Sequence, residues 1–293
     1  MAIYGPQFGV KYVLVGPRGD RAVFNDPTDA DYVGVLTDVQ GLDSPEVRVN
    51  VSEIVQFDGA IQGEQFYGPR PVVLEGMIEN PTSTTERNTR SDKLMRASNA
   101  MIGNATLTWT PDGGMEHYVT MRRAQPLRIS GGWNKSFQAS FVAADPRIYS
   151  SLLESQTILV DSAPNEGFGF PIVFPLTFGD GVLAGLMAAE NKGNGVSYPV
   201  LFIAGPGQNP TLQNLTTDER IVINTTLAAG ATLIVDTLNR TVITDLGVNR
   251  YSAVDYVSTE WWGLVPGVNQ LRLFWFSSSE PASLNIQWRH ATL

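Results

Sequence analysis

The sequence lacks cysteine altogether, and it holds two histidines, His117 and His290, in 293 residues. The absence of cysteine excludes disulfides, thiolate metal sites and cysteine nucleophiles. With two imidazoles, a metal centre of several histidines is not expected, and a general base would be one of these residues or a carboxylate. No G-x-S-x-G, G-x-x-x-x-G-K-[ST] or H-E-x-x-H motif occurs. We therefore expect no enzyme, with no catalytic residue, no cofactor and no metal.

Basic charge and long apolar runs are also scarce. The formal net charge is −9 at pH 7, and neither half of the chain is basic. General electrostatic binding to nucleic acid or to an anionic membrane is therefore not expected. There is no apolar run of about 18 residues that could cross a membrane, and no basic and apolar leader at the start. We expect a soluble, unprocessed chain.

Two weaker patterns have structural explanations. Asp26, Asp29 and Asp31 resemble part of a calcium loop, but the glycine and glutamate that such a loop needs do not follow. Neither His117 nor His290 is paired by sequence with a serine or a carboxylate. We interpret the aspartates as loop residues and the histidines as ordinary strand residues.

The chain instead contains short β-branched and aromatic runs, separated by many of its 28 glycines and 18 prolines. This pattern is typical of a mainly β protein. Val47, Val49 and Val51 alternate with polar residues, which predicts a half-buried strand. Residues 284–288 alternate in the same way, with apolar side chains on one face. Residues 271–276 are apolar on nearly both faces, which predicts a central strand between two stacked layers.

One segment has helical periodicity. Ser83 to Glu86 have the spacing of a capping box, and apolar residues then recur on one face until Gly103. We predict a helix at about 84–102. A basic stripe follows this helix at every third residue: Arg87, Arg90, Lys93 and Arg96. The stripe is either a solvated face or a subunit contact.

A polar, turn-rich stretch at about 150–165 predicts a division into domains 1–155 and 156–293. The second domain has the strand number and spacing of a β-sandwich, with strand-like runs at 158–160, 171–178, 197–203, 220–223, 232–235, 251–257, 270–276 and 283–290. In this domain Trp261 and Trp262 are adjacent, so one ring points to each face. The outward ring is a candidate contact for a ligand or a partner.

Several stretches, in order, resemble the distal tail protein family of long-tailed siphophages, the siphovirus-type tail component. The stretches that carry the resemblance are Gly41–Arg48, Asp58–Pro71, Leu74–Gly76, Arg122–Arg128, Gly132–Lys135 and Ala144–Tyr149. In the second domain the resemblance is looser and rests on Gly207–Thr211 and Pro266–Asn269.

The resemblance implies an N-terminal domain with a tail-tube-like β-sandwich or barrel and one helix, and a C-terminal galectin-like β-sandwich. It implies a homo-oligomer, a hexameric ring that joins the tail-tube protein to tail-tip or baseplate proteins, with DNA passing through its bore unbound. The location would be the distal end of the tail in the virion, after assembly in the host cytoplasm. Galectins bind galactosides through His-x-Asn-Pro-Arg, whereas Gln208 and Thr211 flank Asn209-Pro210 here, so we expect no galactoside site.

The alternative is a carbohydrate-binding module at the tail tip that contributes to host adsorption. The clustering of tryptophans in the last third of the chain favours it, because exposed rings stack on sugars. If the protein is a structural hub, the candidate subunit or partner contacts are the basic stripe together with Trp261 and Trp262.

Overall fold

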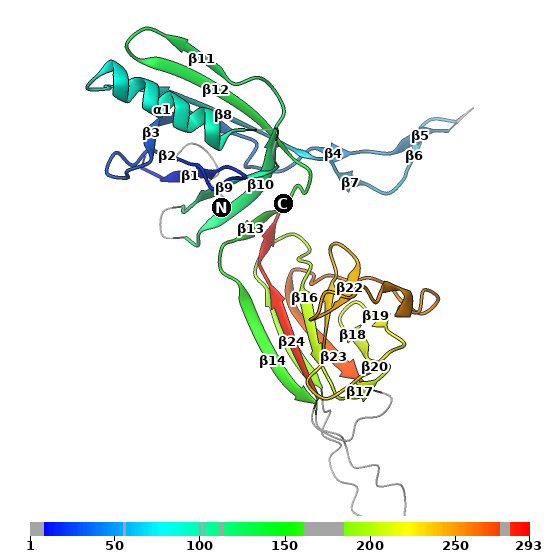
Figure 1. Ribbon diagram of the computed structural model, residues 1–293. Helices are drawn as coiled ribbons and strands as arrows, with labels where there is room; N and C mark the ends of the chain where they lie inside the picture. Colours follow the sequence, from blue (N-terminus) through cyan, green and yellow to red (C-terminus); the bar gives the residue numbers. More distant parts are fainter. Residues whose placement is uncertain are drawn as a thin grey trace, which may run out of the picture. The chain divides into compact units, whose positions relative to one another are not determined.

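The structure is a computed structural model that describes residues 9–54, 57–99, 101, 103–111, 114–160, 185–275 and 282–293. The chain forms two compact units, Met1–Leu152 with Thr292–Leu293, and Leu153–Ala291 (Figure 1). The boundary expected after Ser155 lies three residues beyond this division, inside strand β14 (Glu154–Val160). The serines at 150 and 151, which helped to predict a linker, come directly before this strand, and the polar residues 162–167 lie outside the described residues. β14 pairs with β24 (Ala282–Trp288).

A closed barrel of seven strands forms the body of the first unit. In spatial order they are β12 (Lys135–Ala143), β8 (Arg70–Ile78), β3 (Tyr32–Gln40), β2 (Arg21–Phe24), β1 (Tyr12–Val15), β9 (Ala105–Trp109) and β10 (His117–Arg123). Neighbours are antiparallel except β2 and β3, which are parallel. The sheet extends beyond the barrel through β11 (Arg128–Gly131), which pairs with β12, and through β13 (Ile148–Ser150) and β25 (Ala291–Thr292).

The barrel is filled by alternate residues of its strands, as the two-residue period of a strand requires. Leu74 of β8 and Phe141 of β12 are fully buried, for example. Gly76 faces Phe137 across these strands, and a Cβ at Gly76 would lie 2.5 Å from the Phe137 ring. Glycine at this position therefore makes room for a large aromatic ring in the core.

The helix α1 (Thr84–Ala97) begins where the sequence predicts. Ser83 is the N-cap, and its hydroxyl accepts a hydrogen bond from the Glu86 N–H at 3.1 Å. The Glu86 carboxylate accepts from the backbone N–H of Thr82 at 2.7 Å, one residue before the position of a standard capping box. The helix buries its face at Ser91, Leu94 and Ala97.

The helix ends at Ala97, so the predicted end at Ile102 is wrong. The Asn99 N–H donates to the carbonyl of Arg96 at 3.1 Å, which is a tight turn rather than a helical bond. The Asn99 side chain also accepts from the Met101 N–H at 3.0 Å. Asparagine ends helices in this way, because its amide offers the backbone an alternative partner.

The second unit is a sandwich of two antiparallel sheets, and the mainly β fold is confirmed. One sheet has the order β14, β24, β16 (Val200–Ala204), β21 (Thr232–Asp236) and β22 (Thr241–Thr244). The other has the order β15 (Leu186–Asn191), β23 (Gly267–Phe274), β18 (Thr211–Asn214) and β19 (Glu219–Val222). A short pair, β17 (Gly207–Gln208) and β20 (Thr226–Leu227), completes it.

The predicted periodicity of this unit is largely confirmed. Residues 284, 286 and 288 are buried and the residues between them are partly exposed, and β23 is a central strand. The run 251–257 was wrongly predicted as a strand. It starts with the 3-10 helix η1 (Tyr251–Ala253). After this helix the Asp255 N–H donates to the carbonyl of Val222, at the end of β19. The predicted run 171–178 lies outside the described residues.

Candidate functional site

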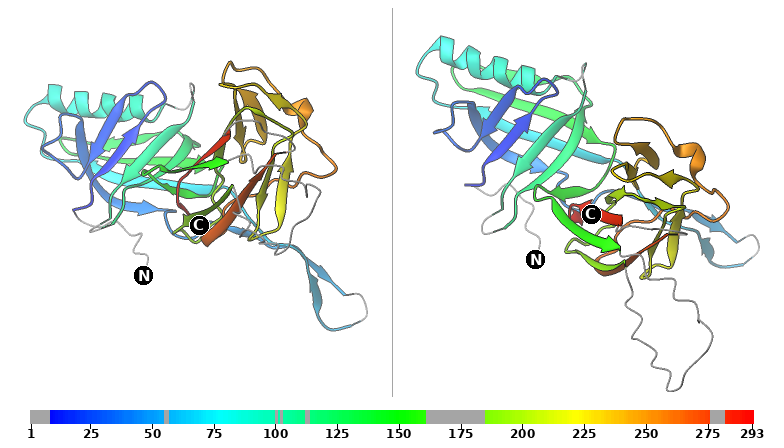
Figure 2. Two further views of the ribbon diagram at one scale, coloured as in Figure 1. Left: turned by 90° about the horizontal axis from the view of Figure 1, so that it is seen from below. Right: turned by 60° about the horizontal axis from the view of Figure 1, so that its bottom comes forward.

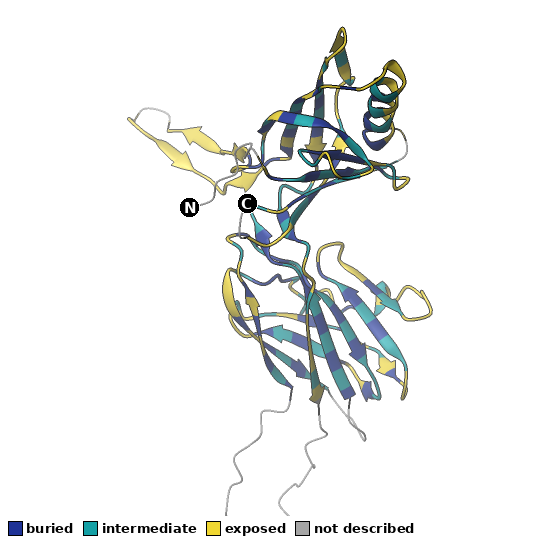
Figure 3. Ribbon diagram, turned by 90° about the vertical axis from the view of Figure 1, so that its left-hand side faces the viewer, coloured by how far each residue is buried: buried dark blue, intermediate teal, exposed yellow. Residues whose placement is uncertain are grey.

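A two-stranded arm leaves the barrel between β3 and β8 and is the most exposed feature of the first unit (Figures 1 and 2). Its lower part pairs β4 (Val47–Arg48) with β7 (Phe66–Tyr67), and its outer part pairs β5 (Val51–Glu53) with β6 (Ala60–Gln62). Every residue of these four strands is exposed. Figure 3 shows the exposed residues along the whole arm.

The prediction that Val47, Val49 and Val51 form a half-buried strand is therefore wrong for the single chain. Their alternation is present, but among the described residues of the first unit none forms a second layer over the arm, and Val49 is 58% exposed. Phe57 and Ile61 are 77% and 65% exposed. Contiguous exposed apolar side chains of this kind mark interaction surfaces.

The register shows that both faces of the arm are apolar. In the lower pair, Val47 and Tyr67 lie opposite each other and share one face. Phe66 lies on the other face of that pair. In the outer pair, Val51 lies on one face and Ile61 on the opposite one. A single flat surface could cover one face only, so the arm can contact more than one neighbour.

Arg70 anchors the base of the arm. Its side chain is fully buried at the start of β8. Its Nε donates to the carbonyl of Pro146 at 2.6 Å, and its Nη1 donates to the carbonyl of Gly41 at 2.8 Å and to that of Asp43. Gly41 and Asp43 lead into the arm, so one guanidinium fixes the arm to the loop before β13. The sequence placed Arg70 within the family resemblance but assigned it no role.

The basic stripe is mostly engaged within the unit. Arg87 donates to the carbonyl of Gly132 at 3.2 Å. Arg90 donates to the carbonyl of Glu79 at 3.1 Å. Lys93 pairs with Asp31 at 3.0 Å. These contacts hold α1 on the barrel. Arg96 is exposed on the helix surface.

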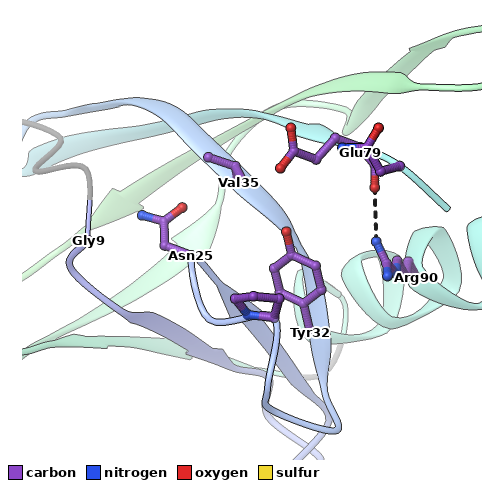
Figure 4. A pocket seen from close by; sticks show the side chains of 8 residues that line it. Gly9, Asn25, Tyr32, Val35, Glu79 and Arg90 are labelled. Carbon is purple, nitrogen blue, oxygen red and sulfur yellow. Dashed lines mark hydrogen bonds between the residues drawn. The ribbon is translucent and has the colours of Figure 1, made fainter.

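A hollow of about 380 Å³ lies beside this helix and is lined by Gly9, Asn25, Pro27, Tyr32, Val35, Glu79, Asn80 and Arg90 (Figure 4). Its polar groups serve the fold. The guanidinium of Arg90 lies 4.8 Å from the centre of the Tyr32 ring. Asn25 donates to the carbonyl of Val10 at 2.9 Å and accepts from the Leu36 N–H at 2.8 Å. These groups pin neighbouring elements together, and the hollow shows no nucleophile paired with a base.

The two adjacent tryptophans differ in burial, and both pack in or against the core of the second unit. Trp262 is 2% exposed, and its indole N–H donates to the carbonyl of Leu212 at 3.2 Å. It therefore offers no surface to a partner or a sugar, and its place among the candidate contacts is wrong. Trp261 is half-buried and stacks on Tyr251, with ring centres 6.4 Å apart.

The aspartate-rich loop is neutralised by a lysine. The ammonium of Lys11 lies 2.9 Å from Asp26 and 2.8 Å from Asp29. Hydrogen bonds from Thr28 and then from Lys11 lower the pKa of Asp26 to about 2. Among the described residues, no group of three or more acidic or histidine side chains could hold a metal ion.

The two histidines lie in different units. His117 begins β10 beside the Trp109 ring, with ring centres 5.9 Å apart, and burial lowers the pKa of its imidazole. His290 is 5% exposed, and its Nδ1 accepts from the Lys192 N–H at 3.2 Å. Its Nε2 lies 3.4 Å from a carboxylate oxygen of Glu154. No helix of the described residues has the length and apolar character of a membrane span.

Known proteins with the same fold define the class. Residues 192–291 match the sequence profile of the siphovirus-type tail component, C-terminal domain. The whole chain resembles the SPP1 Dit (gp 19.1) protein, described as a paradigm of the hub adsorption apparatus in phages that infect Gram-positive bacteria. The TM-score is 0.65 at 12% identity, over 94% of this chain and 98% of that one. A chain of the activated phage p2 baseplate with Sr matches with a TM-score of 0.50 at 13% identity, over 95% and 97%.

The profile thus identifies a siphovirus-type tail component domain in residues 192–291, and the fold of the whole chain is similar to that of a phage tail hub protein. The resemblance seen in the sequence is confirmed by these two comparisons. A search of curated protein sequences finds no match to this chain.

Proposed function

We propose that this protein is the distal tail protein of a siphophage, a structural hub without catalytic activity. In this proposal six copies form a ring between the tail tube and the tail-tip or baseplate proteins, and DNA passes through the bore. Assembly in the host cytoplasm would place the ring at the distal end of the tail. The observation that carries the proposal is the exposed, apolar arm of the first unit.

The arm favours association with a second copy for an energetic reason. Eight of its large apolar side chains are exposed by roughly half: Val47, Val49, Val51, Ile54, Phe57, Ile61, Phe66 and Tyr67. Burying the exposed half of each side chain contributes about 1 kcal/mol to the free energy of association, or roughly 8 kcal/mol for one arm. This is similar to the cost of association, about 4–15 kcal/mol. The arm can therefore drive assembly only together with further contacts.

The direction of the contact favours a closed ring. An arm that docks on a different surface of its neighbour makes a head-to-tail interface, and such interfaces close into rings when the rotation allows it. Acidic charge is also compatible with a channel for DNA, because carboxylates repel phosphates and prevent binding. The net charge of −9 agrees with this.

Mass photometry and negative-stain microscopy of the purified full chain test the proposal. We expect six-fold rings, single or stacked in pairs, at micromolar concentration. A variant in which residues 49–65 are replaced by a short Gly-Ser turn should stay monomeric with both units folded. A wild-type chain that is monomeric at high concentration and missing from purified tails would refute the hub.

The carbohydrate-binding alternative gains no support from the tryptophans, since Trp262 lies in the core. We therefore do not propose it as a second function. A glycan array with the full chain is its direct test.

A further inference from the structure

The outer part of the arm carries charge of one sign. Between residues 49 and 68 the charged residues are Glu53, Asp58 and Glu64, with no lysine or arginine. All three are exposed. Glu53 lies opposite Ala60, and Glu64 follows Ala60 by four residues, two residues beyond the end of β6. At about 3.3 Å per residue, Glu53 and Glu64 are separated by about 13 Å along the arm.

A surface of the barrel has the complementary charge. On the outer face of β12, Arg128 of β11 lies opposite Gln138, and Arg122 of β10 lies opposite Val142. Both arginines are exposed. Gln138 and Val142 are four residues apart on one strand, so the two arginines are also separated by about 13 Å.

The rest of this face suits an apolar ribbon. Val142 is 36% exposed and lies opposite Pro71, which is exposed at the start of β8. Ser140, between the two arginine positions, has a small side chain and leaves the face flat. Glu75 also lies on this face, where the Gln138 amide donates to its carboxylate at 2.6 Å. That contact engages part of its negative charge.

The length of the arm matches the distance to a neighbour. From Val47 to Ile54 the chain advances about 23 Å at about 3.3 Å per residue. A unit of about 150 residues has a radius of gyration of about 15 Å, and is thus about 40 Å across. The arm stands out from its own barrel (Figures 1 and 3). An arm of this length can therefore cross more than half of an adjacent barrel.

We propose that the arm of one copy docks on the β10–β11–β12 face of the next copy, with Glu53 and Glu64 paired to Arg122 and Arg128. The ribbon between these carboxylates covers Val142 and Pro71 of the neighbour. This proposal rests on the proposed function, because it names the partner surface of the arm within the ring. The ion pairs set the register of the arm and favour the correct neighbour, which is the usual role of charges at an interface.

The pairing is tested by reversing these charges in the full chain and measuring assembly by mass photometry at low salt. Arg122→Glu with Arg128→Glu should raise the concentration for half-assembly roughly tenfold or more, since like charges then face each other. Glu53→Arg with Glu64→Arg should do the same. The chain with all four changes should assemble within about threefold of wild type, because the charges are complementary again.

The matched control is Arg18→Glu with Arg220→Glu, which makes the same change in net charge at exposed sites elsewhere. It should assemble like wild type, and circular dichroism should show every variant folded. If wild type forms no ring, the proposed function fails. A second outcome is that wild type forms rings but the double reversals assemble like the control, or that the chain with all four changes does not regain assembly. The proposed function is then retained, and this docking surface is wrong.

Discussion

Replacing Arg70 by methionine should loosen the first unit and the base of the arm. Methionine fills a similar volume but donates no hydrogen bond. The change removes the bonds from a buried guanidinium to the carbonyls of Pro146, Gly41 and Asp43. Hydrogen bonds from a charged group contribute about 1.5–3 kcal/mol each, and carbonyls left buried without a donor add a penalty. Relief from the cost of burying the charge offsets part of this loss.

We therefore expect a net loss of about 4 kcal/mol in the free energy of opening of the first unit, against about 5–15 kcal/mol for the stability of a typical domain. Hydrogen exchange followed by mass spectrometry measures this for each unit separately. Peptides from β8 and β12 should exchange about a thousandfold faster, since about 1.4 kcal/mol corresponds to a factor of ten. Peptides from β16 and β24 should be unchanged, which provides a control within the same molecule.

Two further variants sharpen the result. Arg70→Lys keeps the charge but lacks the planar fork, so it should recover about half of the loss. Arg18→Met alters an exposed arginine in a turn and should change stability by less than about 0.5 kcal/mol. If Arg70→Met costs less than about 1 kcal/mol, or if both units loosen equally, the guanidinium is not the anchor described here.

Three other predictions concern pH and the second unit. Burial lowers the pKa of the His117 imidazole in the folded protein. As the pH falls below about 6.5, this imidazole is therefore protonated in the unfolded chain before it is protonated in the folded one. Stability should fall from pH 7.5 to 5.5 in urea titrations, and less so in His117→Phe; equal pH slopes would contradict this. The pKa of Asp26 is lowered to about 2, so its contribution is present above about pH 4 and lost as the pH approaches 2. In Lys11→Met, NMR titration should show this pKa shifted upward but still below its ordinary value, since Thr28 remains. Trp262→Ala should cost about 3–5 kcal/mol by opening a cavity in the sandwich, and differential scanning calorimetry should show a lower Tm for that unit alone; an unchanged Tm would place the ring outside the core.

The sequence predicted local features whose causes lie within a few residues. Ser83 caps α1 because its hydroxyl reaches an N–H three residues away, and the prediction is confirmed. The alternation at 284–288 is likewise confirmed, because the partner layer belongs to the same sandwich. The predicted helix end at Ile102 was wrong, because the Asn99 side chain accepts a hydrogen bond from a backbone N–H beyond the helix.

Features that depend on distant partners could not be predicted. Arg70 is buried because carbonyls from residues 41, 43 and 146 converge on it, and no local pattern announces such a cluster. The return of Thr292 and Leu293 to the first unit is another example. Arginine between two prolines, in a stretch otherwise rich in apolar residues, is the one signal that could have drawn attention to position 70.

The arm shows why a wrong expectation can carry functional information. Alternation of apolar and polar residues reflects the environment in which a strand is buried, and for Val47, Val49 and Val51 the single chain supplies no such environment. An exposed ribbon with apolar side chains invites aggregation unless an intended partner covers it. The alternation is explained if a second copy covers the apolar face of the arm in the assembled tail, as a second layer would within one chain. The mismatch between periodicity and exposure in the isolated chain thus supports the ring, independently of the fold's likeness to known tail proteins.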